Sequence, residues 1–277
     1  MRGYVTSLLL SRLELETGKQ ITDLFDLIAG VSTGSLIAGG LSNGMSADEV
    51  SQLYKTLYPE IFGAGRSWFG WLFSSKYDIS RLEKIARKEM PISMGMCPTK
   101  IMIHAVQLSG PTLRPKFWKS WHDDDADYPL WQLATASSAA PTFFDPYPIG
   151  PHYYIDGGIA ENNPATCSLA EAIRLEVPLE NITAITVGGV AVPGQKNARK
   201  LRGLIKIGPI AAGLMLDCGV RTVDYQCQNL LGTRYLSAMG NHAFAIDSAE
   251  FEKMEAEAAI QWDKYGEHML NMVTTCQ

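Results

Sequence analysis

This sequence of 277 residues is poor in cysteine and in charged side chains, and basic residues are not in excess. Its five cysteines are an odd number without the spacing of a metal site, which predicts reduced thiols, an intracellular protein and no structural metal. The net charge of -5 and the lack of a long basic cluster argue against nucleic acid as a partner. We therefore expect a cytoplasmic protein without a metal or other cofactor.

A long uninterrupted hydrophobic run is also missing. The longest apolar stretch, residues 204–216, contains Lys206 and Pro209 and is too short to span a bilayer. The apolar residues around Leu8 are soon followed by charged ones, which argues against a signal peptide. With 46% hydrophobic and 19% charged residues, the composition is instead that of a compact enzyme with a large core.

Strand-like and helix-like patterns alternate along the chain, and no linker, internal repeat or low-complexity tract interrupts them. This alternation predicts a single α/β domain over residues 1–277, with a three-layer αβα architecture and a central, largely parallel sheet. Capping boxes at Ser46 and Ser80 predict two helix starts. Strands are expected near residues 100–107, 114–118 and 182–187 and before Asp156, and helices near 130–139, 163–175, 208–231 and 249–272.

The most informative segment is a strand-like run that breaks at residues 30–34, Gly-Val-Ser-Thr-Gly, and continues as a helix. Such a Gly-x-Ser-x-Gly turn is typical of a nucleophile elbow, in which a strained backbone lifts the serine hydroxyl out of the sheet. Small residues at Gly30 and Gly34 would let strand and helix pass closely. Ser32 is therefore the candidate nucleophile, although the pattern also occurs in ordinary glycine-rich turns.

A second candidate group lies much further along the chain, where a strand-like segment delivers Asp156 into a turn of two glycines, Gly157 and Gly158. Glycines at such a turn allow another backbone or a substrate to approach the carboxylate closely. The sequence thus supplies a candidate base to accompany the candidate nucleophile.

Together, the Ser32 turn, the Asp156 turn and the alanine- and serine-rich residues 134–144 resemble the patatin-like phospholipase family. Members of that family place the nucleophile in an Asp-Leu-Ile-x-Gly-x-Ser-x-Gly context. An alanine- and serine-rich helix then runs into Ala-Pro and an aromatic pair, and the acid follows in Asp-Gly-Gly or Asp-Gly-Ala. All three features occur here in that order, and the match covers most of the chain.

The resemblance implies a Ser-Asp dyad in which Ser32 is the nucleophile and Asp156 accepts its proton. Such a carboxylate must lie within direct hydrogen-bond reach of the hydroxyl in a partly desolvated site. His152 is the one histidine to weigh as a third member, because a strand would place it on the same face as Asp156. A structural histidine at a strand edge is the favoured interpretation.

The resemblance also implies a glycine-rich loop, Asp-Gly-Gly-Gly-x-Arg/Lys-Gly, whose N–H groups form the oxyanion hole. The sequence opens with Met1, Arg2 and Gly3, which match only the end of that loop, so the first strand and most of the loop are expected to be missing. Arg2 and Gly3 are the loop positions that remain. The backbone N–H of Thr33, directly after the nucleophile, is a further candidate donor.

Two other segments allow more than one interpretation. Residues 67–73 carry four large aromatic side chains, which suit a membrane interface, a lid over an acyl channel or a small packed cluster. Arg66 and Lys76 stand near this segment and could meet lipid phosphates. The acidic run at residues 123–127 lacks the ligand spacing of a calcium loop and is predicted to be a solvated turn.

The leading hypothesis is a calcium-independent lipid acyl hydrolase that cleaves carboxylic esters of phospholipids or related acyl lipids through an acyl-Ser32 intermediate. Its substrate would lie in a membrane surface that the protein contacts peripherally. The alternative is a catalytically silent, patatin-like lipid-binding or regulatory protein. A protein acyltransferase or thioesterase that uses the same dyad is a third hypothesis.

Overall fold

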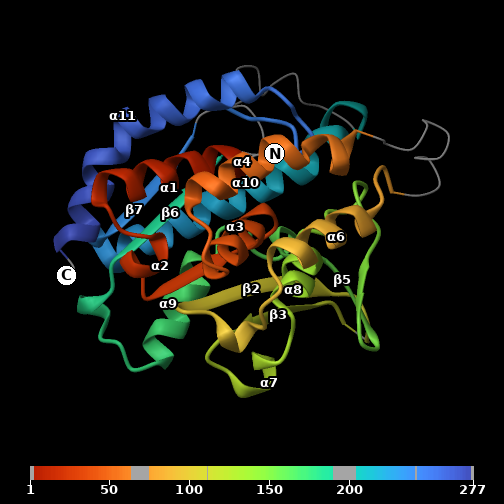
Figure 1. Ribbon diagram of the computed structural model, residues 1–277, viewed down its shortest axis with the longest axis horizontal. Coiled ribbons are helices and arrows are strands. Elements are labelled where there is room, and N and C mark those ends of the chain that lie inside the picture. The colour runs from red at the N-terminus through yellow and green to blue at the C-terminus, as the bar shows by residue number, and fades with distance from the viewer. Residues whose placement is uncertain (1–2, 64–74, 111, 190–203, 241, 276–277) are drawn as a thin grey trace. The chain divides into compact units, whose positions relative to one another are not determined.

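The computed structural model describes residues 3–63, 75–110, 112–189, 204–240 and 242–275 (Figure 1). The chain divides into two compact units, with the boundary inside the first helix. The five-strand unit is Ser7–Ala160, and the two-strand unit combines Met1–Thr6 with Glu161–Gln277. Helices and strands are interspersed along the sequence in both units, which confirms the α/β class. A single domain over the whole chain stays a prediction.

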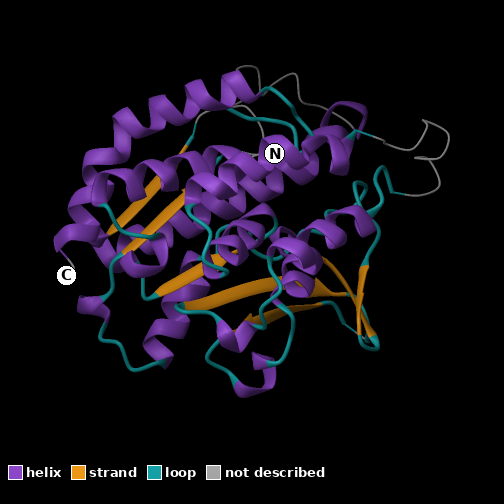
Figure 2. Ribbon diagram, in the orientation of Figure 1, coloured by secondary structure: helices purple, strands orange, loops and turns teal. Residues whose placement is uncertain are grey.

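The five-strand unit contains most of the elements that were expected from the sequence, together with some that were not (Figure 2). Its strands are β1 (Leu27–Gly30), β2 (Lys100–Gln107), β3 (Arg114–Lys119), β4 (Tyr147–Ile149) and β5 (His152–Asp156). Its helices are most of α1 (Gly3–Thr17), then α2 (Ile21–Leu24), α3 (Thr33–Ser42), α4 (Ala47–Phe62), α6 (Ile79–Glu89), α7 (Asp123–Ala126) and α8 (Leu130–Ser137), with short 3-10 turns at Met94–Met96 and Gly157–Ile159.

The sheet of this unit is mixed rather than largely parallel, which corrects the prediction. Strand β1 pairs with β2 in parallel, whereas β3 and β5 pair with β2, and β4 with β5, in antiparallel fashion. The physical reason lies in the connections, because only two residues separate β4 from β5 and six separate β2 from β3. A parallel pair needs a crossover of about a dozen residues or more.

The ends of β1 and β5 meet at the same edge of β2. Gly30 at the end of β1 pairs with Ile103, and Asp156 at the end of β5 pairs with Ala105. Strand β3 pairs with residues 102–107 of β2 and so occupies its other edge. Because β1 runs parallel and β5 antiparallel to β2, their carboxyl ends converge from opposite directions on either side of His104.

The core of the five-strand unit forms between β2 and α8. Six consecutive residues of β2, Ile101–Val106, are buried, as expected for a central strand that is covered on both faces. Alternate residues Ile101, Ile103 and Ala105 share a cluster with Leu133 of α8. Helix α3 packs against α8 and β1. A Cβ on Gly39 of α3 would lie 2.2 Å from the sulfur of Met90, which follows α6, and 3.7 Å from a methyl carbon of Leu130 in α8. This packing fixes the turn between β1 and α3 against the end of α8.

Helix starts follow the capping signals, with one correction. Ser46 caps α4 in a capping box with Glu49, as predicted. The cap of helix α6 lies two residues before the predicted one, because the carboxylate of Asp78, and not Ser80, is the cap and accepts a hydrogen bond from the N–H of Ser80. Aspartate and serine are comparably good caps, so the pattern alone did not distinguish two candidates that lie two residues apart.

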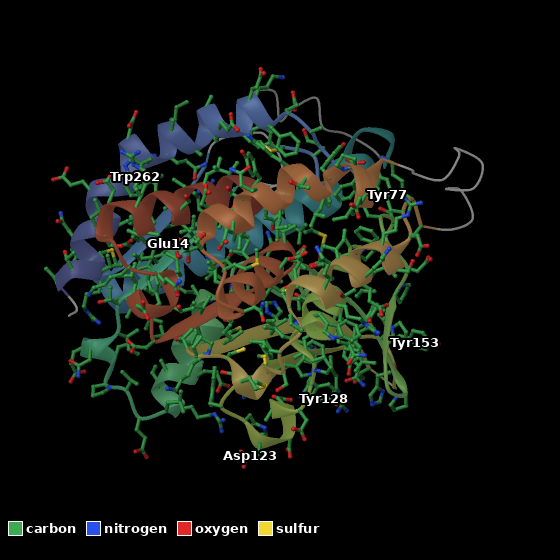
Figure 3. The ribbon with its side chains drawn as sticks, in the orientation of Figure 1. Glu14, Tyr77, Asp123, Tyr128, Tyr153 and Trp262 are labelled. Atoms are coloured by element: carbon green, nitrogen blue, oxygen red, sulfur yellow. The ribbon has the colours of Figure 1, made fainter. Side chains whose placement is uncertain are left out.

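The acidic run is not wholly a solvated turn, which is a second correction. It forms the short helix α7, where Asp123 is labelled in Figure 3. Asp124 is exposed, but Asp125 is buried and accepts hydrogen bonds from the Lys116 ammonium at 2.9 Å and from the N–H of Lys119 at 3.1 Å. Asp125 therefore stabilises β3 rather than facing water.

The two-strand unit contains β6 (Ala184–Gly188) and β7 (Tyr235–Met239), which pair in parallel, with helices α9 (Ala165–Arg174), α10 (Leu204–Leu231) and α11 (Phe251–Thr275). All but β7 were expected, with ends shifted by a few residues. Its core packs α9 and α10 against β7 around Tyr235, whose hydroxyl donates to Asp224 at 2.7 Å. Among the described residues, none of the helices has both the length and the hydropathy to cross a bilayer.

Candidate active site

Ser32 adopts the strained conformation that the sequence predicts for an elbow nucleophile. It lies between β1 and α3, with φ 53° and ψ −127°. A positive φ is uncommon for a residue with a side chain, and this region of the map is populated almost only by glycine. The backbone at Ser32 is thus held in a geometry that it would not adopt without support from its surroundings.

The two glycines of the motif differ in whether the surrounding structure leaves room for a side chain. A Cβ on Gly30 would lie 2.4 Å from the carbonyl oxygen of Gly34, so a side chain there cannot fit while strand and helix keep this approach. A Cβ on Gly34 would meet nothing within 4 Å. The close passage of strand and helix therefore requires glycine at position 30, and position 34 faces open space instead.

Ser32 and Asp156, 124 residues apart in sequence, are in direct contact. The Oγ of Ser32 donates a hydrogen bond of 2.6 Å to Oδ2 of Asp156, and the N–H of Gly158 donates one of 2.7 Å to Oδ1. Asp156 is 7% exposed, so most of its carboxylate is shielded from water. A buried carboxylate that accepts a serine proton directly has the geometry of a general base.

The turn after Asp156 fits tightly against β2. A Cβ on Gly157 would lie 2.2 Å from the carbonyl oxygen of His104, so this position requires glycine for a close backbone approach. The N–H of Asp156 donates to the carbonyl of Ala139 at 2.9 Å, which ties the turn to the end of α8 as well. Asp156 is therefore held by backbone contacts of its turn on two sides.

Sequence reasoning singled out residues 134–144 as part of the family pattern but gave the serines in them no role. In the structure, the N–H of Ser32 donates to Oγ of Ser137 at 2.9 Å. Oγ of Ser138 donates to the carbonyl of Ser32 at 2.9 Å. The family pattern in the sequence indicates that residues 134–144 lie near Ser32. The direction in which each serine hydroxyl points depends on how α8 packs, which the sequence does not give.

Of the candidate oxyanion positions, Thr33 lies next to Ser32 as the first residue of α3. In the described part of the chain, no acceptor contacts its N–H, as is usual for the first turn of a helix. Its carbonyl accepts a hydrogen bond from Tyr54 at 3.1 Å, and burial raises the pKa of that tyrosine, which keeps the hydroxyl protonated. Gly3 opens α1, and Arg2 lies outside the described residues, so both remain predictions.

His152, the histidine weighed as a third member, does not join the pair, and neither does His104. His152 begins β5, four residues before Asp156, and a strand rises about 3.3 Å per residue, which separates the two by roughly 13 Å. His104 is buried, and its ring stacks on that of Phe117. The aromatic segment at residues 67–73 and Arg66 lie outside the described residues. Lys76 lies over the rings of Tyr77 and Phe143.

A family comparison agrees with this geometry. The model of the family described as patatin-like phospholipase matches residues 1–166, a segment that includes both Ser32 and Asp156. The chain belongs to the patatin-like phospholipase family. The resemblance that the motifs suggested is thereby confirmed.

Curated relatives carry phospholipase names. The chain is 30% identical over 211 residues to calcium-independent phospholipase A2-gamma of Oryctolagus cuniculus, which covers 68% of this chain and 27% of that protein. It is 27% identical over 246 residues to cGAMP-activated phospholipase of Pseudomonas aeruginosa, which covers 84% of this chain and 73% of that protein. The match thus spans about a quarter of the A2-gamma protein and about three quarters of the bacterial one.

A solved structure, that of VipD from Legionella pneumophila, aligns with 95% of this chain and 65% of its own, with a TM-score of 0.45 and 9% sequence identity.

Proposed function

We propose that this chain is a serine hydrolase of the phospholipase A type, which cleaves carboxylic esters of phospholipids or related acyl lipids through an acyl-Ser32 intermediate. The observation that carries the proposal is the 2.6 Å hydrogen bond from Ser32 to a buried Asp156. The strained backbone at Ser32 and membership in the patatin-like phospholipase family support it.

The chemistry follows from the two side chains. Oγ of Ser32 attacks the carbonyl carbon of the ester while Oδ2 of Asp156 accepts its proton, and the carbonyl oxygen becomes an oxyanion. We expect the N–H of Thr33 to donate to that oxyanion. When the tetrahedral intermediate collapses, the alcohol leaves with the proton from Asp156, and the acyl group stays on Ser32.

The second half reverses these roles. Water attacks the acyl-Ser32 carbonyl while Asp156 accepts a proton from it, and the fatty acid leaves as Ser32 recovers its proton from Asp156. The hydrogen bond from Gly158 to Oδ1 keeps the other carboxylate oxygen turned away, so that Oδ2 faces the hydroxyl in both half-reactions.

The lipid class and the independence from calcium come from the names of the relatives and belong to this proposal. A cytoplasmic location also belongs to it, with substrate drawn from a membrane surface. The four described cysteines are free thiols.

Hydrolysis of phosphatidylcholine vesicles in the presence of EDTA tests the proposal, with released fatty acid measured by mass spectrometry. Ser32→Ala and Asp156→Asn should each lose activity by about three orders of magnitude or more. Ser51→Ala is the matched control, because Ser51 is buried but donates to the carbonyl of Asp48 in its own helix. Vesicle binding without fatty acid release by the wild-type chain would instead favour the silent lipid-binding alternative.

A further inference from the structure

The conformation of Ser32 needs an external restraint, and the structure contains one that the catalytic scheme does not use. Residues with side chains keep such a backbone only when neighbouring groups fix it. Both backbone polar groups of Ser32 are hydrogen-bonded to serine side chains, and two of these serines, Ser137 and Ser138, end the same helix, α8.

Among the described residues, the N–H of Ser32 has a single acceptor, one of these serines. Ser137 is fully buried, and its Oγ accepts from the Ser32 N–H at 2.9 Å. The same Oγ donates to the carbonyl of His104 at 2.7 Å. A hydroxyl has one proton, and a carbonyl can only accept, so the proton points to His104 and a lone pair faces Ser32. The donor and the acceptor in both hydrogen bonds, from Ser32 to Ser137 and from Ser137 to His104, are thus determined.

The carbonyl of Ser32 is held redundantly. It accepts from the N–H of Ser35 at 2.9 Å and from two hydroxyls, that of Ser35 at 2.6 Å and that of Ser138 at 2.9 Å. Loss of the Ser138 hydroxyl leaves two donors in place. Loss of the Ser137 hydroxyl leaves the partly buried Ser32 N–H without this acceptor and the His104 carbonyl without that donor.

His104 is also the residue against which the turn of the base is packed. Gly157 approaches the carbonyl oxygen of His104 so closely that no Cβ fits, and Asp156 pairs with Ala105 next to it. The backbone of the nucleophile and the turn of the base therefore both contact the same peptide group of β2, the first through the Ser137 hydroxyl and the second directly.

We infer that Ser137 is a positioning residue, whose hydroxyl holds the Ser32 backbone at a fixed distance from the peptide group that also seats the Asp156 turn. This inference rests on the proposed function for its catalytic consequence. Ser138 acts on the same backbone but is backed up by Ser35. Removal of the Ser137 hydroxyl should displace Ser32 Oγ relative to Asp156 Oδ2 while both side chains remain present.

Two readouts test this inference in Ser137→Ala, Ser138→Ala and the control Thr135→Val. Thr135 is fully buried on the same helix, but its hydroxyl donates only to the carbonyl of Trp131 one turn earlier. The first readout is the rate at which a fluorophosphonate labels Ser32. We expect a decrease of roughly 10- to 100-fold for Ser137→Ala, since small misplacements of reacting groups have effects of that order. Less than about a 3-fold change is expected for Ser138→Ala and for the control.

The second readout is hydrogen exchange of the Ser32 amide, which needs no catalysis. We expect exchange at least about 10-fold faster in Ser137→Ala than in Thr135→Val, because only the former removes the acceptor of that N–H. Should the wild-type chain fail to react with the fluorophosphonate, the proposed function would be wrong, yet the exchange measurement would still decide the structural part of the inference.

Equal exchange and equal labelling in Ser137→Ala and Thr135→Val would overturn the inference. Should Ser137→Ala not fold, Ser137→Cys replaces it, because a thiol fills similar space but is a weaker hydrogen-bond partner. Slower labelling and faster exchange in Ser137→Cys than in Thr135→Val would support the inference, and values equal to the control would overturn it.

Discussion

Gly157 lies so close to His104 that a Cβ on the glycine would stand 2.2 Å from the histidine's carbonyl oxygen. The contact is between backbone atoms, so no side-chain rotation can relieve it. It lies one residue after Asp156, whose carboxylate accepts a hydrogen bond from the Ser32 hydroxyl. The position of the base therefore depends on the absence of a side chain next to it.

We predict that Gly157→Ala lowers stability by about 1–3 kcal/mol, the usual range for overpacking, and reduces ester hydrolysis by roughly 10- to 100-fold or more. The backbone of the turn must move away from His104, and Asp156 moves with it. Denaturant unfolding and hydrolysis rates would check this. Wild-type activity in the variant would show that the turn tolerates the shift and that the close contact is not needed.

Gly30 and Gly34 offer a matched pair in the elbow. A Cβ on Gly30 would lie 2.4 Å from the carbonyl oxygen of Gly34, whereas one on Gly34 would meet nothing. We expect Gly30→Ala to lower the free energy of unfolding by about 1–3 kcal/mol. Gly34→Ala should change it by less than about 1 kcal/mol, since alanine in a helix is intrinsically favoured over glycine. The denaturation midpoints of the two variants should differ clearly, and equal midpoints would contradict this account of the elbow.

The sequence predicts those parts of the site that depend on neighbouring residues, and not those that depend on contacts between segments far apart in the chain. The elbow at Ser32 and the acid at Asp156 are local motifs with a characteristic composition, so they could be identified without coordinates. Their contact requires β1 and β5 to converge on β2 from opposite directions, and strand pairing between distant segments leaves no local signature. For the same reason, the sheet was expected to be largely parallel.

Other features were missed because short strands and single polar residues give no clear signal in the sequence. Strand β4, Tyr147–Ile149, has only three residues and contains a proline, and β7 was not recognised before α11. The role of Ser137 depends on where its hydroxyl points at the end of α8, which follows from packing and not from the motif itself. Asp125 was expected to face water with its acidic neighbours, and only the position of Lys116 on β3 explains its burial.

The buried carboxylate of Asp125 leads to a prediction about stability. We expect Asp125→Ala to lower the free energy of unfolding by about 1–3 kcal/mol, because the N–H of Lys119 and the ammonium of Lys116 lose their acceptor. Lys116 is partly exposed and can turn toward water, which limits the loss. Asp124→Ala, at an exposed position of the same helix, should change stability by less than about 0.5 kcal/mol. Urea titrations of the two variants would check the difference.

The thiol of Cys227 leads to a prediction about pH. Burial, helped by the carboxylates of Asp224 and Glu161, raises the pKa of Cys227 to about 11. Because this pKa is raised in the folded state, the neutral thiol contributes stability below the ordinary thiol pKa, and that contribution is lost as the pH rises toward 11. At pH 8 only about one molecule in a thousand carries the thiolate, which is the reactive form.

We therefore expect iodoacetamide at pH 8 to modify the exposed Cys218 readily and the buried Cys227 much more slowly in the folded protein, as mapped by peptide mass spectrometry. The rate at Cys227 should rise about tenfold per pH unit up to its pKa, as long as the protein stays folded. Fast modification of Cys227 in the folded protein at pH 8 would show that this thiol is neither buried nor shifted.

The most direct test of the central claim is labelling of the purified chain with a fluorophosphonate ester, followed by mass mapping of the modified peptide. Because Asp156 accepts a hydrogen bond from Ser32 Oγ, we predict that the label appears on Ser32 in the wild-type chain and is lost in Asp156→Ala. A folded wild-type protein without label on Ser32, or equal labelling in Asp156→Ala, would contradict the assignment of these two residues as nucleophile and base.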